Sequence, residues 1–225
     1  MKKITNFLRG IENKTHAKDS THYFPRGSWH SKDTLEVDVI NGDAGDKIPA
    51  KLLEQYLPDG GTILEIYAGA CDITYHIAKL GMNPKWKIYA TDIQATDFLT
   101  TPRSEKWGIE LYDISINDLI KQDLPEKIDV LLCRHAFGRI ESHFGGGTQG
   151  QLTDEERDSI TKNNTMTEEW MFRNFRYYLA DIGVRGERSV ERYEQNLNMY
   201  SDGINNVDIL GGIEEFYLVK LNEID

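Results

Sequence analysis

The chain has 225 residues, which is enough for one domain with a substantial hydrophobic core. Its composition, 39% hydrophobic and 28% charged, is that of an ordinary globular protein, and its apolar runs are too short for a transmembrane helix. The formal net charge of −11 argues against a non-specific grip on nucleic acid, which normally requires a basic face, but leaves room for a local basic patch.

The first part of the chain predicts a helix followed by an irregular segment. Apolar residues recur at helical spacing over residues 1–12. These apolar positions are Ile4, Phe7, Leu8 and Ile11. Residues 13–46 are polar and aromatic, and their Gly, Asp and Asn content predicts a cap without regular structure. The basic start is not followed by a sustained apolar core, so we expect no signal peptide.

Helices and strands are expected to alternate from residue 47 to residue 133. Residues 47–57 predict a helix that ends at the Pro-Asp-Gly-Gly turn. The expected strands are residues 62–67, 86–91, 108–112 and 128–133. The expected helices between them are residues 72–80, 95–99 and 116–122. Such alternation indicates a parallel sheet with crossover helices.

The alternation breaks after the fourth strand. Residues 138–165 contain Gly145 to Gly147 and Gly150, and we expect a loop and insertion there, either a lid over a binding site or a surface segment. An amphipathic helix is expected next, and its apolar positions are Trp170, Met171, Phe175, Tyr178 and Leu179. A second, charged helix is expected near residues 189–199. Residues 207–210 and 215–221 predict an antiparallel hairpin that turns at Gly211-Gly212.

These elements predict a single domain over residues 1–225 of the α/β class. Its sheet should be doubly wound and mostly parallel, with an antiparallel hairpin at the C-terminal end. In sheets of this kind, ligands bind outside the carboxyl ends of the parallel strands. The candidate site residues are therefore sought where the expected strands end.

Asp92, at the end of the second expected strand, is the first candidate. It lies about 20 residues past a strand that ends in a turn of small residues, the arrangement in which an acid accepts hydrogen bonds from both ribose hydroxyls. A nicotinamide dinucleotide would use the same acid, but the full Gly-x-Gly-x-x-Gly fingerprint for its pyrophosphate is missing. The structural alternative is an acid that caps the next helix. The spacing favours a nucleoside-bearing cofactor.

Four runs of the sequence, within residues 48–221, resemble motifs of the class I S-adenosylmethionine-dependent methyltransferases. Residues 64–71 (LEIYAGAC) are similar to the first motif, in which an acid precedes a Gly-rich turn. Only Gly69 of the usual glycines is present, and Tyr67 and Cys71 stand where small residues are common. The other three matches are residues 88–93 (IYATDI), 111–114 (LYDI) and 129–137 (DVLLCRHAF).

The resemblance implies a Rossmann-like methyltransferase fold with S-adenosylmethionine as cofactor. The implied cofactor-binding residues are Glu65, Tyr67, Gly69, Asp92, Ile93, Asp113, Ile114 and Cys133. Glu65 would hold the methionine part of the cofactor beside the turn, and Ile93 would lie along the adenine. Asp113 would accept a hydrogen bond from the adenine amino group, and the backbone amide of Ile114 would donate to a ring nitrogen.

His135 is the candidate catalytic residue. It follows the fourth strand, beside the expected position of the sulfonium, and its imidazole can take a proton near neutral pH. The structural alternative is a histidine that packs the cofactor or bonds to a buried carbonyl. The Asn/Asp-Pro-Pro-aromatic and Pro-Cys motifs of base methylation are missing here, and methyl transfer can proceed largely by positioning.

Metal and thiol chemistry are not expected to organise the site. His16, His22 and His30 match no short two-ligand pattern, so we expect no metal. The two cysteines, Cys71 and Cys133, exclude a disulfide framework and are expected to lie near one another as reduced thiols. A reducing cytoplasm is the expected compartment.

The resulting hypothesis is an S-adenosylmethionine-dependent methyltransferase whose acceptor is a small molecule or a short peptide. One alternative is a nucleic-acid or protein methyltransferase in which a partner supplies the missing positive surface. Another is a non-catalytic binding module of the same fold, which the altered turn at Tyr67 and Cys71 favours. The sequence gives neither the acceptor nor the oligomeric state, and it predicts no membrane partner.

Overall fold

The structure is a computed structural model. It describes residues 2–12, 48–66, 68, 72–78, 85–92, 108–133, 169–181, 207–213 and 216–222. The expected helix at residues 95–99, the charged helix near 189–199, the whole cap at 13–46 and the insertion at 138–165 lie outside these ranges. These features, and the division of the chain into one domain with a cap and an insertion, stay predictions.

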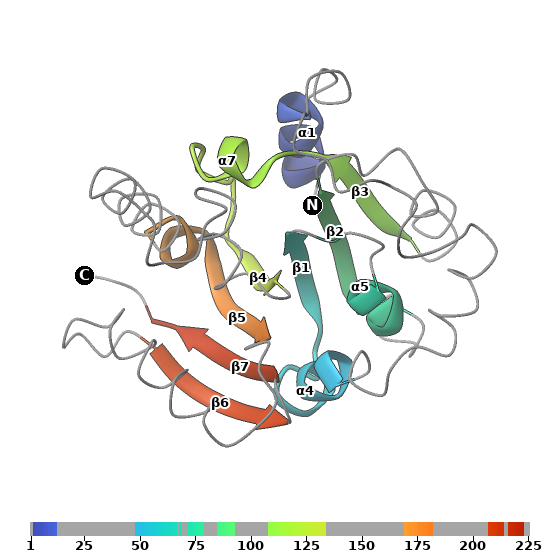
Figure 1. The fold of residues 1–225 in the computed structure, drawn as a ribbon, viewed down its shortest axis with the longest axis vertical. Coiled ribbons are helices and arrows are strands. Elements are labelled where there is room, and N and C mark those ends of the chain that lie inside the picture. Colours follow the sequence, from blue (N-terminus) through green and yellow to red (C-terminus); the bar gives the residue numbers. More distant parts are fainter. Residues whose placement is uncertain are drawn as a thin grey trace, which may run out of the picture.

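A seven-stranded mixed sheet forms the centre of the fold (Figure 1). Its strands are β1 (Gly61–Ile66), β2 (Trp86–Asp92), β3 (Ile109–Asp113), β4 (Ile128–Cys133), β5 (Phe175–Asp181), β6 (Val207–Ile213) and β7 (Phe216–Leu221). Their order across the sheet is β3-β2-β1-β4-β5-β7-β6. The first five strands in this order are mutually parallel, and β7 is antiparallel to both β5 and β6.

Helices cover both faces of the sheet. The described helices are α1 (Lys2–Ile11), α4 (Ile48–Tyr56), α5 (Asp72–Ile77), α7 (Ile116–Leu119) and a turn-length helix over residues 169–174. Side chains of α1, α7 and residues 169–174 share one buried cluster with the sheet, and those of α4 and α5 share the other. No helix in the described ranges is long and apolar enough to cross a membrane.

The burial of the strands explains why they fold as a parallel sheet. The last four residues of β1 are all buried, and β4 is buried at every position except Asp129. Strands covered by helices on both faces read as nearly continuous apolar runs, whereas a half-exposed strand alternates. The α/β prediction, with its mostly parallel sheet and antiparallel C-terminal hairpin, is therefore confirmed.

The prediction of one long helix through Phe175, Tyr178 and Leu179 is wrong. The helix ends at Asn174, and Phe175–Asp181 forms β5, which pairs with β4. The buried Asn174 side chain donates to the Trp170 carbonyl at 2.8 Å and accepts from the Leu124 backbone N–H at 2.7 Å. Asn174 thereby binds the end of the helix to the turn that precedes β4, and the chain enters the sheet.

The C-terminal hairpin is confirmed, but the predicted position of its turn is wrong. Gly211 and Gly212 lie within β6, where they pair with Leu218 and Tyr217 after a register shift that begins at Ile209. A β-carbon at Gly211 would overlap the Tyr56 hydroxyl, and one at Gly212 would lie 2.5 Å from the Tyr217 ring. The two glycines therefore leave space for the side chains of Tyr56 and Tyr217, and they do not form the turn of the hairpin.

The amino-terminal ends of the central strands are bound together by Asp129. Its carboxylate accepts a hydrogen bond from the Thr62 backbone N–H at 2.8 Å and from the Arg176 guanidinium at 2.6 Å. These contacts join β4 to β1 on one side and to β5 on the other. Gly61 leaves the room that this requires, because a β-carbon there would lie 2.5 Å from an Asp129 carboxylate oxygen.

Substitution Asp129→Ala is expected to lower the free energy of unfolding by about 1–3 kcal/mol, because it leaves the Thr62 N–H and the Arg176 guanidinium without this acceptor. Urea denaturation measures the change. Asp208→Ala is the matched control. Among the hydrogen bonds of the described region, the carboxylate of the exposed Asp208 accepts only from the side chain of Asn222, at 3.1 Å. Equal losses in the two variants would contradict a special role for Asp129.

Candidate functional site

The parallel strands β3, β2, β1 and β4 end together at one edge of the sheet. Ile66, the last residue of β1, pairs with Thr91 of β2 on one side and with Cys133 of β4 on the other. Asp92 of β2 pairs with Asp113 of β3. This register brings the predicted residues Glu65, Asp92, Asp113 and Cys133 to the edge where ligands bind in open α/β sheets.

Alternation along the strands divides these residues between the two faces. Ile63 of β1, Ala90 of β2 and Ile109 of β3 belong to the cluster that α4 and α5 cover. Glu65, Asp92 and Asp113 follow them at even spacing and so lie on that face. Cys133 belongs to the opposite cluster, with α1 and α7, and its buried thiol does not share the face of the acids.

Asp92 and Asp113 form a pair of carboxylates on neighbouring strands. They are register partners, so their backbones lie about 4.8 Å apart. Asp113 is buried, and Asp92 is partly exposed. Ionised carboxylates only accept hydrogen bonds, so this pair suits a ligand that presents hydroxyl or amino groups and repels one that presents phosphate there.

Glu65 lies deeper in the sheet than this pair. It is 2% exposed and is the register partner of Ala90, two residues before Asp92. The Thr91 hydroxyl donates to the Glu65 carbonyl at 3.4 Å, and the Ala68 backbone N–H donates to the Thr91 carbonyl at 3.1 Å. The second bond continues the contact between β1 and β2 beyond Ile66, so Ala68 lies beside the end of β2.

The end of β3 is fixed by two hydrogen bonds that backbone N–H groups donate. The Asp113 N–H donates to a carboxylate oxygen of Glu12 at 3.2 Å, across 101 positions of the sequence. The Ile114 N–H donates to the Tyr112 carbonyl at 3.1 Å and so closes a tight turn. Any ligand atom that accepts from the Ile114 amide would compete with the Tyr112 carbonyl for this proton.

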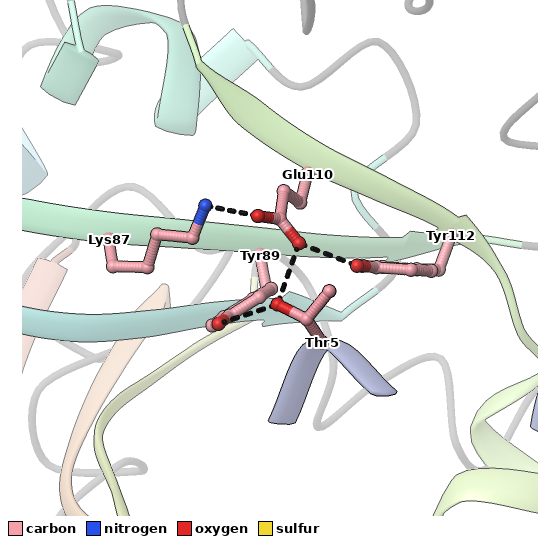
Figure 2. Close-up of polar contacts among 5 residues, drawn as sticks. All are labelled: Thr5, Lys87, Tyr89, Glu110 and Tyr112. Atoms are coloured by element: carbon pink, nitrogen blue, oxygen red, sulfur yellow. Dashed lines mark hydrogen bonds and ion pairs between the residues drawn. The ribbon is translucent and has the colours of Figure 1, made fainter. Parts of the chain in front are cut away.

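A polar cluster holds α1 against β2 and β3 (Figure 2). Thr5 of α1 donates to Glu110 at 3.0 Å and lies 3.3 Å from the Tyr89 hydroxyl. Glu110 also accepts a hydrogen bond from Tyr112 at 2.6 Å and forms an ion pair with Lys87. The buried side chains of Ile4 and Leu8 pack beneath the same helix. The helix is therefore fixed to the sheet by both apolar and polar contacts.

The pKa of Glu110 reflects this environment. Burial raises the pKa of its carboxyl, but hydrogen bonds from Lys87, Tyr112 and Thr5, together with the Lys87 charge, outweigh burial and hold the pKa below its ordinary value. Burial and the neighbouring Glu110 carboxylate raise the pKa of the Tyr112 hydroxyl. Glu110 is therefore an ionised acceptor, and Tyr112 is a stable donor, at neutral pH.

Several predicted site residues lie outside the described part of the chain. These are Tyr67, Gly69, Cys71, Ile93 and His135. The expected proximity of Cys71 to Cys133 and the role of His135 therefore stay predictions. Among the described residues, no group of three or more His, Cys, Asp or Glu side chains is arranged to hold a metal ion.

Sequence reasoning missed Glu12 as a residue of this edge. The helix expected over residues 1–12 contains Glu12 only as its last residue. Nothing in the local sequence around Glu12 predicts a contact with Asp113. The amphipathic pattern of Ile4, Leu8 and their neighbours predicts which face of α1 packs, and Glu12 follows that face by one helical turn after Leu8. A contact between two segments so far apart becomes visible only when the helix has been placed on β3.

Comparison of the sequence with protein-family models and with curated proteins gives no match. Solved structures give matches of low identity. The bifunctional kinase-methyltransferase WbdD is 12% identical, with a TM-score of 0.47 over 85% of this chain, and this chain spans only 40% of WbdD. The ribosomal protein L11 methylase of Lactobacillus delbrueckii subsp. bulgaricus is 14% identical, with a TM-score of 0.44 over 81% of each chain.

A third similar structure is M. capricolum TrmK in complex with S-adenosyl-homocysteine. It is 15% identical, with a TM-score of 0.43, and the match covers 77% of this chain and 67% of TrmK. At these identities and TM-scores the likeness assigns no activity to this chain.

The contribution of Glu110 to stability is expected to disappear in acid. Because its folded pKa lies below the ordinary value of 4.5, the ionised carboxylate stabilises the fold above that value, and this contribution is lost as pH falls through the lowered pKa. The difference in unfolding free energy between the unaltered chain and Glu110→Gln should therefore be largest near neutral pH and shrink below about pH 4.

Urea denaturation over this pH range measures the difference. Glu54→Gln, at an exposed position of α4, is the control for a carboxylate outside the cluster. A difference for Glu110→Gln that stays constant between neutral pH and strong acid would contradict the proposed role of the ionised carboxylate.

Proposed function

We propose that the edge formed by β1, β2 and β3 binds the nucleoside part of S-adenosylmethionine, and that the protein is a methyltransferase. The observation that carries the proposal is the register pair of Asp92 and Asp113 on one face of the sheet. Asp92 would accept hydrogen bonds from the ribose hydroxyls. Asp113, on the next strand outward, would accept one from the adenine amino group.

The charge of the edge favours this cofactor over a nucleotide. Three carboxyl groups gather here. Asp92 and Asp113 are the last residues of β2 and β3, and the Glu12 carboxylate contacts the backbone of Asp113. A phosphate group at this place would meet unfavourable Coulomb interactions. S-adenosylmethionine has no phosphate and carries a positive sulfonium, so its chemistry matches the acids better than that of a dinucleotide.

The remaining cofactor contacts follow the strand order. Glu65, on β1, would hold the methionine part together with the turn that contains Tyr67 and Gly69. Ile93 would lie along the adenine. Cys133 would border the cofactor through its backbone, because its side chain belongs to the face covered by α1 and α7. The Ile114 N–H would bond to the adenine only by leaving the Tyr112 carbonyl.

In the proposed reaction the bound cofactor supplies a methyl group on sulfur, and S-adenosyl-homocysteine leaves as a neutral thioether when the acceptor atom takes that group. The chain's part is to hold the donor at the edge so that the acceptor approaches in line. His135, which follows β4, would accept the proton that the acceptor loses. We propose that the acceptor is a small molecule or a short peptide. The proposed compartment is a reducing cytoplasm.

Substitution Asp92→Ala is expected to weaken the binding of S-adenosylmethionine at least about a hundredfold. It removes two charge-assisted hydrogen bonds, and each is worth roughly 1.5–3 kcal/mol. Isothermal titration calorimetry with S-adenosylmethionine and S-adenosyl-homocysteine measures the change. Asp123→Ala is the matched control, because Asp123 is exposed and precedes β4, at the opposite edge of the sheet.

Unchanged affinity in folded Asp92→Ala would rule out this residue as the ribose acceptor. If the unaltered chain binds neither ligand, the proposed cofactor is wrong. Binding of both ligands without transfer of a labelled methyl group to any small molecule or peptide tested would favour the non-catalytic binding module over an enzyme.

A further inference from the structure

The helix α1 reaches the same edge of the sheet as the acid pair. Thr5 contacts Glu110 in β3, and Glu12, just after α1, contacts Asp113 at the end of β3. Seven residues of helix rise about 10 Å, which matches the three strand residues from Glu110 to Asp113. The helix therefore runs alongside β3 and in the same direction, and it brings Glu12 to the edge.

Glu12 is held firmly at this place. Its backbone N–H donates to the Leu8 carbonyl at 2.9 Å, so it continues the helical hydrogen bonding of α1. Leu8 is fully buried between α1 and the sheet. The Glu12 carboxylate thus approaches the Asp113 N–H from an element that is anchored independently of the edge itself.

We infer that Glu12 is a positioning residue for recognition of the adenine base: by accepting the Asp113 N–H, it fixes the backbone from which the Asp113 carboxylate meets the amino group of the base. This inference rests on the proposed function. The Asp113 N–H belongs to the last residue of an edge strand, and without Glu12 the strand end would lose this bond from α1. A strand end that is less fixed holds the acceptor less accurately.

The test uses three variants of the full chain. Glu12→Ala removes the acceptor, and Glu12→Gln keeps an oxygen that can accept the same N–H without the charge. Thr5→Ala is the matched control, because it loosens α1 through its contacts with Tyr89 and Glu110 but does not touch Asp113. Thermal melting of each variant shows how much stability it has lost.

Two ligands report on the base. S-adenosyl-homocysteine carries an amino group on the ring, and S-inosyl-homocysteine carries an oxygen at the same position. In the unaltered chain the adenine form should bind more tightly, because the Asp113 carboxylate accepts from the amino group and repels the oxygen. In Glu12→Ala the affinity for S-adenosyl-homocysteine should fall about tenfold, and the preference for adenine over inosine should fall with it.

Glu12→Gln should restore both affinity and preference to within about threefold of the unaltered chain, and Thr5→Ala should leave the preference unchanged even if it melts earlier.

Hydrogen exchange gives a second measurement that needs no ligand. The Asp113 amide should exchange slowly in the unaltered chain and in Glu12→Gln, and at least about tenfold faster in Glu12→Ala.

The outcomes separate this inference from the proposed function. If the unaltered chain binds neither ligand, the proposed function is overturned, and the inference with it. If the unaltered chain binds and Glu12→Ala keeps its affinity and preference, the inference alone is overturned. It is also overturned if Thr5→Ala loses the preference as Glu12→Ala does, or if Glu12→Gln is as defective as Glu12→Ala.

Discussion

The parallel register of β2 between β1 and β3 is the constraint on which the rest of the edge depends. Successive side chains of a strand point to opposite faces, so a slip of β2 by one residue would move Asp92 to the face covered by α1. The observed register pairs Asp92 with Asp113 and Ile66 with Thr91. This register is strongly specified, because Ile88 is buried on one face of the sheet and Tyr89 on the other. A slip by one residue would place each side chain in the space that fits the other, and packing would be lost.

Contacts at both ends of the strands hold the central sheet together. At the amino-terminal edge, Asp129 joins β1, β4 and β5 through the Thr62 N–H and the Arg176 side chain. At the carboxyl edge, the contact between Ala68 and Thr91 extends the pairing of β1 with β2. Among the described strands β3 is outermost, and α1 lies along it. Through Glu12, which directly follows the helix, this segment accepts the backbone N–H of Asp113 at the end of that strand.

The sequence predicts those features that depend on local patterns. The strands β1 to β4 follow from short apolar runs between turn residues, and their predicted bounds agree with the structure to within about one residue. β5 was missed because Phe175, Tyr178 and Leu179 have helical spacing as well as strand-forming side chains. The bonds of Asn174 to Leu124 and Trp170, which end the helix, are tertiary contacts without a local signal.

The order of strands at the carboxyl edge also orders the parts of the proposed ligand. Asp113 on β3, Asp92 on β2 and Glu65 on β1 lie on one face at three neighbouring strands. β4 follows, and His135 comes shortly after it. With strands about 4.8 Å apart, the four ends span about 14 Å. In the proposed binding mode the base would lie at β3, the ribose at β2 and the methionine part at β1. The sulfonium, which joins the ribose to the methionine part, would lie between the last two, with its methyl group directed toward the end of β4. Because each part would meet a different strand, a shift of one strand end would disturb recognition of one part of the ligand more than of the others.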